Sequence, residues 1–141
     1  MAEMKTRNKA CELLAFGFRH AASADPDFLW QAGANRIASV VKDGTTGGTY
    51  TVQFELPYPT ALVGVWPSLH SATADVGEIA NCRADLDSYD ASLGTFDLEV
   101  ITDDGDGTAT IEQPIDNTAV SVLVVAVRSA FVSDDATEAH A

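Results

Sequence analysis

The chain has few basic residues and no long apolar segment, and each scarcity excludes a class of protein. Its 141 residues contain 8 Lys and Arg against 21 Asp and Glu, a formal net charge of −13. This balance disfavours nucleic acid and anionic membranes as partners, because neutralising phosphates requires a clustered basic surface. No apolar run reaches the roughly 18 residues that span a membrane, and residues 1–10 lack the apolar stretch of a signal peptide. We therefore expect a soluble protein that is made in a cytoplasm.

Cysteine and histidine are also scarce, and neither type forms a recognisable site. Cys11 and Cys82 have no metal-binding spacing and no CxxC motif, so we predict unpaired thiols in a protein assembled under reducing conditions. His20, His70 and His140 are scattered, which disfavours metal ligation. No GxSxG motif, phosphate loop, dinucleotide fingerprint or HExxH motif occurs. The sequence thus predicts a protein that is not an enzyme and that uses no cofactor.

One acidic segment, Asp103-Asp104-Gly105-Asp106-Gly107, has the oxygen ligands that suit Ca²⁺ on a tight loop. It does not fit an EF-hand loop, because Ala109 and Ile111 supply no side-chain oxygen. A plain hairpin turn is the favoured interpretation, and calcium binding stays the alternative.

The chain does contain a strand-like heptad that occurs twice. Residues 48–54 (GTYTVQF) and 94–100 (GTFDLEV) both read glycine, threonine, aromatic, polar, aliphatic, polar, apolar. Strict alternation of this kind is typical of a half-buried β-strand. In each half of the chain the heptad precedes a proline-bearing connection and then a run that begins Thr-Ala, at Thr60-Ala61 and Thr118-Ala119. The echo suggests an internal duplication but does not prove it.

Short strands separated by turn signals about every ten residues predict an all-β fold. We expect about eight strands in a single antiparallel sandwich or barrel, two architectures that the pattern does not distinguish. Residues 1–12 are expected to form an N-terminal arm, residues 13–132 the β domain, and residues 133–141 a mobile acidic tail. We expect a turn at Asp87–Asp90. Because of its two prolines, we expect Leu56–Pro59 to form a crossing connection or an edge of a sheet. The strand candidates are 13–19, 28–31, 36–42, 48–54, 61–66, 75–85, 94–100, 108–112 and 120–128.

Two strand candidates, Ala61–Trp66 and Val120–Val127, are apolar on both faces. A sandwich strand has one face on the core, so an apolar second face needs another cover. A loop of the same chain, a closed barrel with a lid, or another subunit would supply it. We favour a subunit because the chain has no long helix to form a further layer. The candidate interface residues are Leu62, Val63, Val65, Trp66, Val122, Val124 and Val125.

Three of the eight basic residues, Lys5, Arg7 and Lys9, lie within the first nine positions. A cationic arm on an acidic body is suited to lie along a neighbouring acidic subunit. The competing interpretation is a solvated, frayed terminus.

Four segments follow one another along the chain: residues 48–54, Leu56-Pro-Tyr-Pro-Thr-Ala-Leu-Val-Gly-Val, residues 94–100, and Asn117 with the run 120–128. In this order they resemble small all-β virion proteins of tailed bacteriophages. These are structural proteins of the capsid decoration or cement type. The resemblance implies a non-enzymatic protein on the capsid surface of a virion, commonly a homotrimer, bound between subunits of the major capsid protein. The candidate arm would then contact the capsid through Lys5, Arg7 and Lys9.

Two other functions remain open from the sequence. A glycan-binding or host-recognition module of a tail or spike would use loop aromatics such as Tyr58 and Tyr89. Tyr58, Trp66 and Trp30 would suit a sugar-stacking platform, but an apolar run around Trp66 favours core packing. A tail-tube or connector component would differ from a decoration protein mainly in ring stoichiometry.

Overall fold

The computed structural model describes residues 11–32, 36–44, 48–70, 79–103, 109–111, 114 and 117–127. Every regular element in these ranges is a β-strand, which confirms the predicted all-β class. The predicted arm residues Lys5, Arg7 and Lys9 lie outside the described residues, as do the acidic tail and most of the Asp103–Gly107 segment. The strands are β1 (Cys11–Arg19), β2 (Asp27–Ala32), β3 (Ile37–Lys42), β4 (Thr49–Phe54), β5 (Ala61–His70), β6 (Ile79–Asp90), β7 (Thr95–Asp103), β8 (Ala109–Ile111) and β9 (Ala119–Val127).

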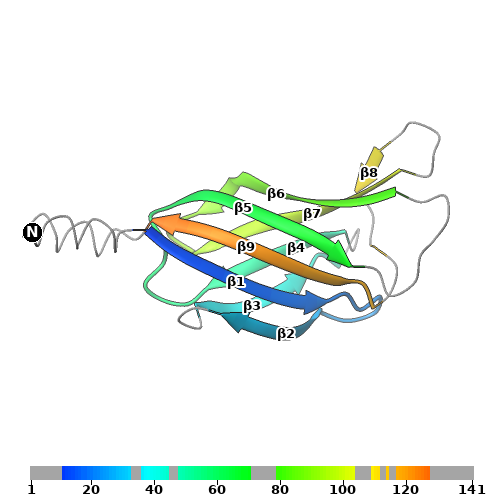
Figure 1. Ribbon diagram of the computed structural model, residues 1–141, viewed down its shortest axis with the longest axis horizontal. Helices are drawn as coiled ribbons and strands as arrows, with labels where there is room; N and C mark the ends of the chain where they lie inside the picture. Colours follow the sequence, from blue (N-terminus) through cyan, green and yellow to red (C-terminus); the bar gives the residue numbers. More distant parts are fainter. Residues whose placement is uncertain are drawn as a thin grey trace, which may run out of the picture.

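The strands form two antiparallel sheets that pack as a sandwich (Figure 1). Sheet A has the order β2-β1-β9-β5, and sheet B has the order β3-β4-β7-β6 with the short β8 beside β7. Figure 1 shows β1, β9 and β5 side by side in the nearer layer. The connection Leu56–Pro59 carries the chain from β4 in sheet B to β5 in sheet A, as its prolines predict.

The core lies between the sheets and takes alternate residues of the central strands. Phe16 and Phe18 of β1 are fully buried, and the ring of Phe18 lies 4.9 Å from that of Tyr50 in β4. Phe54 and Phe96 meet in sheet B with centroids 5.6 Å apart. Burial of each such ring stabilises the fold by about 1.5–3 kcal/mol. The two heptads therefore alternate with period 2 because every second side chain faces this core.

The two heptads are neighbours in sheet B and pair about a common centre. Thr51 and Asp97, the fourth residue of each heptad, are register partners, and the Thr51 hydroxyl donates to Asp97 Oδ1 at 2.9 Å. At the ends, Val100 N donates to Gly48 O and Phe54 N to Gly94 O. β5 and β9, the two strands that follow the Thr-Ala pairs, are neighbours in sheet A. The repeated elements thus face each other across an approximate two-fold axis.

The structure differs from the sequence expectation around β6. The predicted turn at Asp87–Asp90 is wrong, because β6 continues to Asp90 and the chain turns at residues 91–94. Ser88 prolongs the strand, since its hydroxyl accepts a bond from Asp97 N and donates to Asp85 O. The carboxylate of Asp90 then accepts bonds from the backbone of Ser92 and Leu93, which closes the turn.

Two strand limits also differ from the expectation. β1 begins at Cys11, inside the predicted arm, because residues 11–19 pair along their whole length with β9. β5 continues past Trp66 to His70 and includes Pro67. A proline is compatible with this position because β5 pairs only with β9 and forms an edge of sheet A.

Candidate functional site

The two strands that the sequence identified as apolar on both sides, β5 and β9, lie next to each other in sheet A. Their inward residues belong to the core, and their outward residues form part of an exposed surface. β1 and β2 continue this surface on the other side of β9. We call it the apolar face; it consists of Leu13, Trp30, Val63, Trp66, Leu123 and Val125, with Ala15, Ser68 and Ser121 between them.

The structure divides the seven predicted interface residues into two groups. Val122 and Val124 are 2% and 0% exposed, and Leu62 and Val65 pack against the same core. Val122 and Val124 are therefore not available for contact with another protein, whereas Leu62 and Val65 pack on the core and are only partly buried. Val63, Trp66 and Val125 are the outward-facing or exposed members of the set. The sequence identified two strands that carry exposed apolar residues, but it did not separate the two sides of these strands.

The most exposed members of the apolar face are large. Leu13 is 64% exposed, Val63 58%, Trp66 56%, Trp30 44% and Leu123 40%. No other segment within the described ranges covers them. Core packing, the interpretation favoured for Trp66, is therefore wrong, because its ring lies on the outside of the sandwich. Side chains of this size gathered on one sheet face are typical of an interaction site.

Each indole on the apolar face lies over a glycine. A Cβ added to Gly64 would come within 2.5 Å of Cη2 of Trp66, and a Cβ added to Gly17 within 2.4 Å of Nε1 of Trp30. Glycine therefore lets both rings approach the backbone of the sheet. Trp30 belongs to β2 and Trp66 to β5, so the two indoles stand on the two edge strands of sheet A.

Sequence reasoning missed Leu13, Leu123 and Trp30 as members of this surface. The signal for Leu13 was present, because residues 13–18 of β1 are all apolar or glycine, as in β5 and β9. Leu123 lies within the run that was identified, but only the register with Trp66 shows which side it occupies. For Trp30 no local pattern was available, because β2 has a bulge that shifts its alternation.

The outer faces of the two sheets differ in charge. Among the described residues, the acidic and basic side chains of the apolar face lie only at one end, where Arg19 and Asp27 are register partners and His70 closes β5. The outer face of sheet B carries Asp97 and Glu99 on its central strand. The protein therefore presents one apolar and one acidic sheet face.

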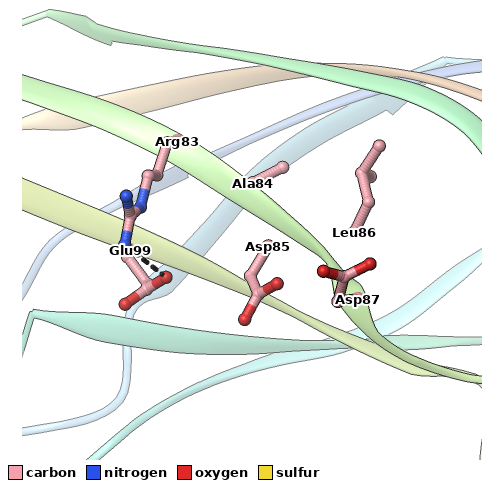
Figure 2. A pocket seen from close by; sticks show the side chains of 6 residues that line it. All are labelled: Arg83, Ala84, Asp85, Leu86, Asp87 and Glu99. Atoms are coloured by element: carbon pink, nitrogen blue, oxygen red, sulfur yellow. Dashed lines mark hydrogen bonds and ion pairs between the residues drawn. The ribbon is translucent and has the colours of Figure 1, made fainter.

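The acidic face has an open hollow of about 350 Å³ along β6 and β7. Figure 2 shows Asp85 and Glu99 on one side of these strands, with Ala84 and Leu86 turned to the other. Arg83 pairs with Glu99 at 3.4 Å across this hollow (Figure 2), and the Arg83 side chain is 60% exposed. Exposed pairs of this kind contribute little to stability. No group of three or more potential metal ligands occurs among the described residues.

Tyr58 and Tyr89, the aromatic residues that a glycan site would use, are engaged within the chain. The ring of Tyr58 lies over Gly94, where an added Cβ would come within 2.3 Å of it. The hydroxyl of Tyr89 donates to the carbonyl of Pro59, and its ring meets Phe54 edge-on at 6.0 Å. Burial, and then the neighbouring carboxylate of Asp90, raise the pKa of Tyr89 to about 12. Both tyrosines thus hold the connection between β4 and β5 in place.

His20 and Tyr50 form a polar contact inside the sandwich. The Tyr50 hydroxyl and His20 Nδ1 are 2.7 Å apart, and the two residues are 0% and 1% exposed, respectively. Burial, and then the neighbouring Cys82, raise the pKa of Tyr50 far above its usual range. A pair so deeply enclosed cannot meet a substrate, so it acts in folding rather than in catalysis.

Both cysteines are free, which confirms the prediction of unpaired thiols. Cys11 is exposed at the start of β1, whereas Cys82 is 5% exposed in β6. Burial, and then the carboxylate of Glu99, raise the pKa of Cys82 from 9.0 to about 12. The folded state therefore keeps this contribution to stability below pH 9 and loses it as the pH rises from 9 toward 12.

We expect thiol reagents to label Cys11 rapidly and Cys82 only after unfolding. At pH 8 the folded chain should react at one thiol, because the thiolate is the reactive form and Cys82 stays protonated and covered. In denaturant both thiols should react. Counting labelled thiols by mass spectrometry checks this, and a Cys11→Ser variant should show no fast reaction. Equal labelling of both cysteines in the folded chain would contradict the placement of Cys82.

No family model, curated protein or solved structure matches the chain. In the part of the chain that the structure describes, no helix is long and apolar enough to cross a membrane.

Proposed function

We propose that this protein is a non-enzymatic structural protein of a tailed bacteriophage virion, which decorates the capsid and binds between subunits of the major capsid protein. The proposal places it on the capsid surface after synthesis in the host cytoplasm. One observation carries it: the sandwich has an apolar outer face on sheet A and an acidic outer face on sheet B. A large exposed apolar face needs a protein partner, as a subunit of a larger protein assembly has, while an acidic face is suited to solvent.

Other features of the described residues agree with a structural role. The buried polar groups hold the fold together: His20 contacts Tyr50, and Arg36 contacts Glu12 and backbone carbonyls. The hollow lined by Arg83, Asp85 and Glu99 is open. A glycan-binding module stays an alternative prediction, but no contact favours it, because Tyr58 and Tyr89 pack against their own chain.

The role of the arm is tested by measuring how tightly the chain, with and without the arm, binds to capsids that lack the protein. Removing residues 1–10 leaves β1 intact, whereas a cut after residue 12 would delete Cys11 and Glu12 from the sheet and from the contact with Arg36. We expect the full chain to co-sediment with capsids and the shortened chain to bind about tenfold more weakly or worse, a loss of about 1.4 kcal/mol. The cause is the loss of Lys5, Arg7 and Lys9, which would face an acidic capsid surface.

The matched control is Arg83→Ala, which removes a basic side chain from the outer face of sheet B and should leave capsid binding unchanged. The thermal unfolding midpoint of each variant shows that the fold is intact. If the full chain does not co-sediment with capsids, the proposed function fails. If the chain without residues 1–10 binds as well as the full chain, only the role of the arm fails.

A further inference from the structure

We infer that the apolar face of sheet A packs against the same face of further copies of this chain around a common axis. The inference rests on the proposed function, because it names the partner of the face on which that proposal depends. It assigns the copy-to-copy contact to sheet A and leaves the capsid contact to other parts of the chain.

The apolar face is large for an exposed surface of a single chain. The exposed fractions of Trp30 and Trp66, 44% and 56%, together correspond to one whole tryptophan side chain, or roughly 250 Å². Leu13, Val63 and Leu123 each expose 40% or more of their surface beside the two indoles. The patch therefore reaches several hundred Å², more than scattered surface residues account for. A patch of this kind, with two tryptophans, has the composition of an interface centre.

The charge distribution of the chain favours a second copy as the partner of this face. Two chains of net charge −13 repel each other on most approaches. Between the two ends of sheet A, however, the described outward residues are uncharged, and at the charged end Arg19 and Asp27 have opposite signs. Contact through sheet A also places the acidic faces with Asp97 and Glu99 on the outside, far from each other. A basic partner protein, in contrast, would be drawn to sheet B.

The apolar face also has a shape suited to contact with itself. Large and small side chains lie next to each other on it: Ala15 of β1 is the register partner of Leu123, and Ser121 of β9 is the register partner of Ser68. Large residues beside small ones allow a large side chain of one copy to settle on a small residue of the next. A surface that carries both parts is self-complementary, as contact between identical copies requires.

The test measures the mass in solution by size-exclusion chromatography with light scattering. We expect the full chain to have two or three times its mass of 14.9 kDa. Leu123→Glu should raise the dissociation constant about 30-fold or more, because it buries an unpaired charge in the contact. Leu13→Glu should raise the dissociation constant in the same way. It should disturb folding even less, because Leu13 is 64% exposed in the single chain.

Val41→Glu is the matched control. Val41 is 46% exposed, close to the 40% of Leu123, but it lies on the outer face of sheet B opposite Thr51. The same change of charge there should leave the mass of the assembly unaltered. A single-chain mass for the unmodified protein at every concentration overturns the inference, as does dissociation by Val41→Glu but not by Leu123→Glu.

The outcome is separable from that of the proposed function. An oligomer that does not bind capsids would refute capsid decoration and leave the copy-to-copy contact standing. A monomer that binds capsids would refute the contact and leave decoration standing. If Leu123→Glu abolished capsid binding while the mass stayed that of the oligomer, the face would belong to the capsid protein, and the inference would be wrong.

Discussion

Replacing Arg36 by methionine is expected to lower the free energy of unfolding by about 3–5 kcal/mol, the largest loss among the single substitutions considered. Arg36 is only 6% exposed, and its Nε donates to Glu12 Oε1 at 2.9 Å. Its Nη1 donates to the carbonyls of Glu55 and Leu56 at 3.0 and 3.1 Å, and Nη2 donates to the carbonyl of Pro57. Methionine leaves a mostly buried carboxylate and three carbonyls without this donor.

Arg83→Met is the matched control for this prediction. Its ion pair with Glu99 spans 3.4 Å, and the Arg83 side chain is 60% exposed. Solvent screens such a pair, so we expect a change of about 0.5 kcal/mol or less. Urea unfolding of both variants, followed by tryptophan fluorescence, gives the comparison. Equal losses for Arg36→Met and Arg83→Met would show that the Arg36 contacts contribute no more than an exposed ion pair.

Arg36→Lys separates charge from geometry. Lysine keeps the positive charge but lacks the planar fork that reaches Glu12 on one side and the carbonyls of residues 55–57 on the other. We therefore expect lysine to recover only part of the loss. The position matters for the proposed function as well, because Arg36 links the start of β1, next to the arm, to the connection between the two sheets.

The strands were predictable because their cause is local. The two heptads alternate with period 2 since Tyr50, Val52, Phe96 and Leu98 all face one core, and a pattern of that kind is visible without knowledge of the fold. The turn after β6 was not predictable in the same way. Asp87, Ser88 and Asp90 are typical turn residues, yet Ser88 bonds to Asp97 of the neighbouring strand and prolongs β6. A contact across nine residues overrode the local preference.

The exposed apolar surface was predictable only in part. A strand that is apolar at every position shows that both faces avoid water, but it does not show which residues face the core. Val122 and Val124 therefore could not be told from Leu123 and Val125 until the register with β1 and β5 was known. No local sequence pattern indicated the role of Arg36, because its hydrogen-bond partners are distant in the sequence, at residue 12 and at residues 55–57.

The second large effect is expected at Gly94, where alanine should lower the free energy of unfolding by about 2–4 kcal/mol. Gly94 has a φ of +68°, a conformation that costs an L-residue about 1–2 kcal/mol. An added Cβ would also come within 2.3 Å of Cδ1 of Tyr58, so the ring must move. The backbone of Gly94 cannot shift easily to relieve the clash, because its N–H bonds to Asp90 O and its carbonyl to Phe54 N.

Gly44→Ala is the control for Gly94→Ala, because an added Cβ at Gly44 meets nothing within 4 Å and its φ is not positive. We expect that change to be neutral, or to stabilise the protein by up to about 1 kcal/mol through the unfolded state. A Tyr58→Ala background then divides the loss at Gly94 into its two causes. Without the ring, Gly94→Ala should cost only the backbone part, about 1–2 kcal/mol. If its cost were the same with and without Tyr58, the ring would not be the obstacle, and the strained backbone alone would require glycine at this position.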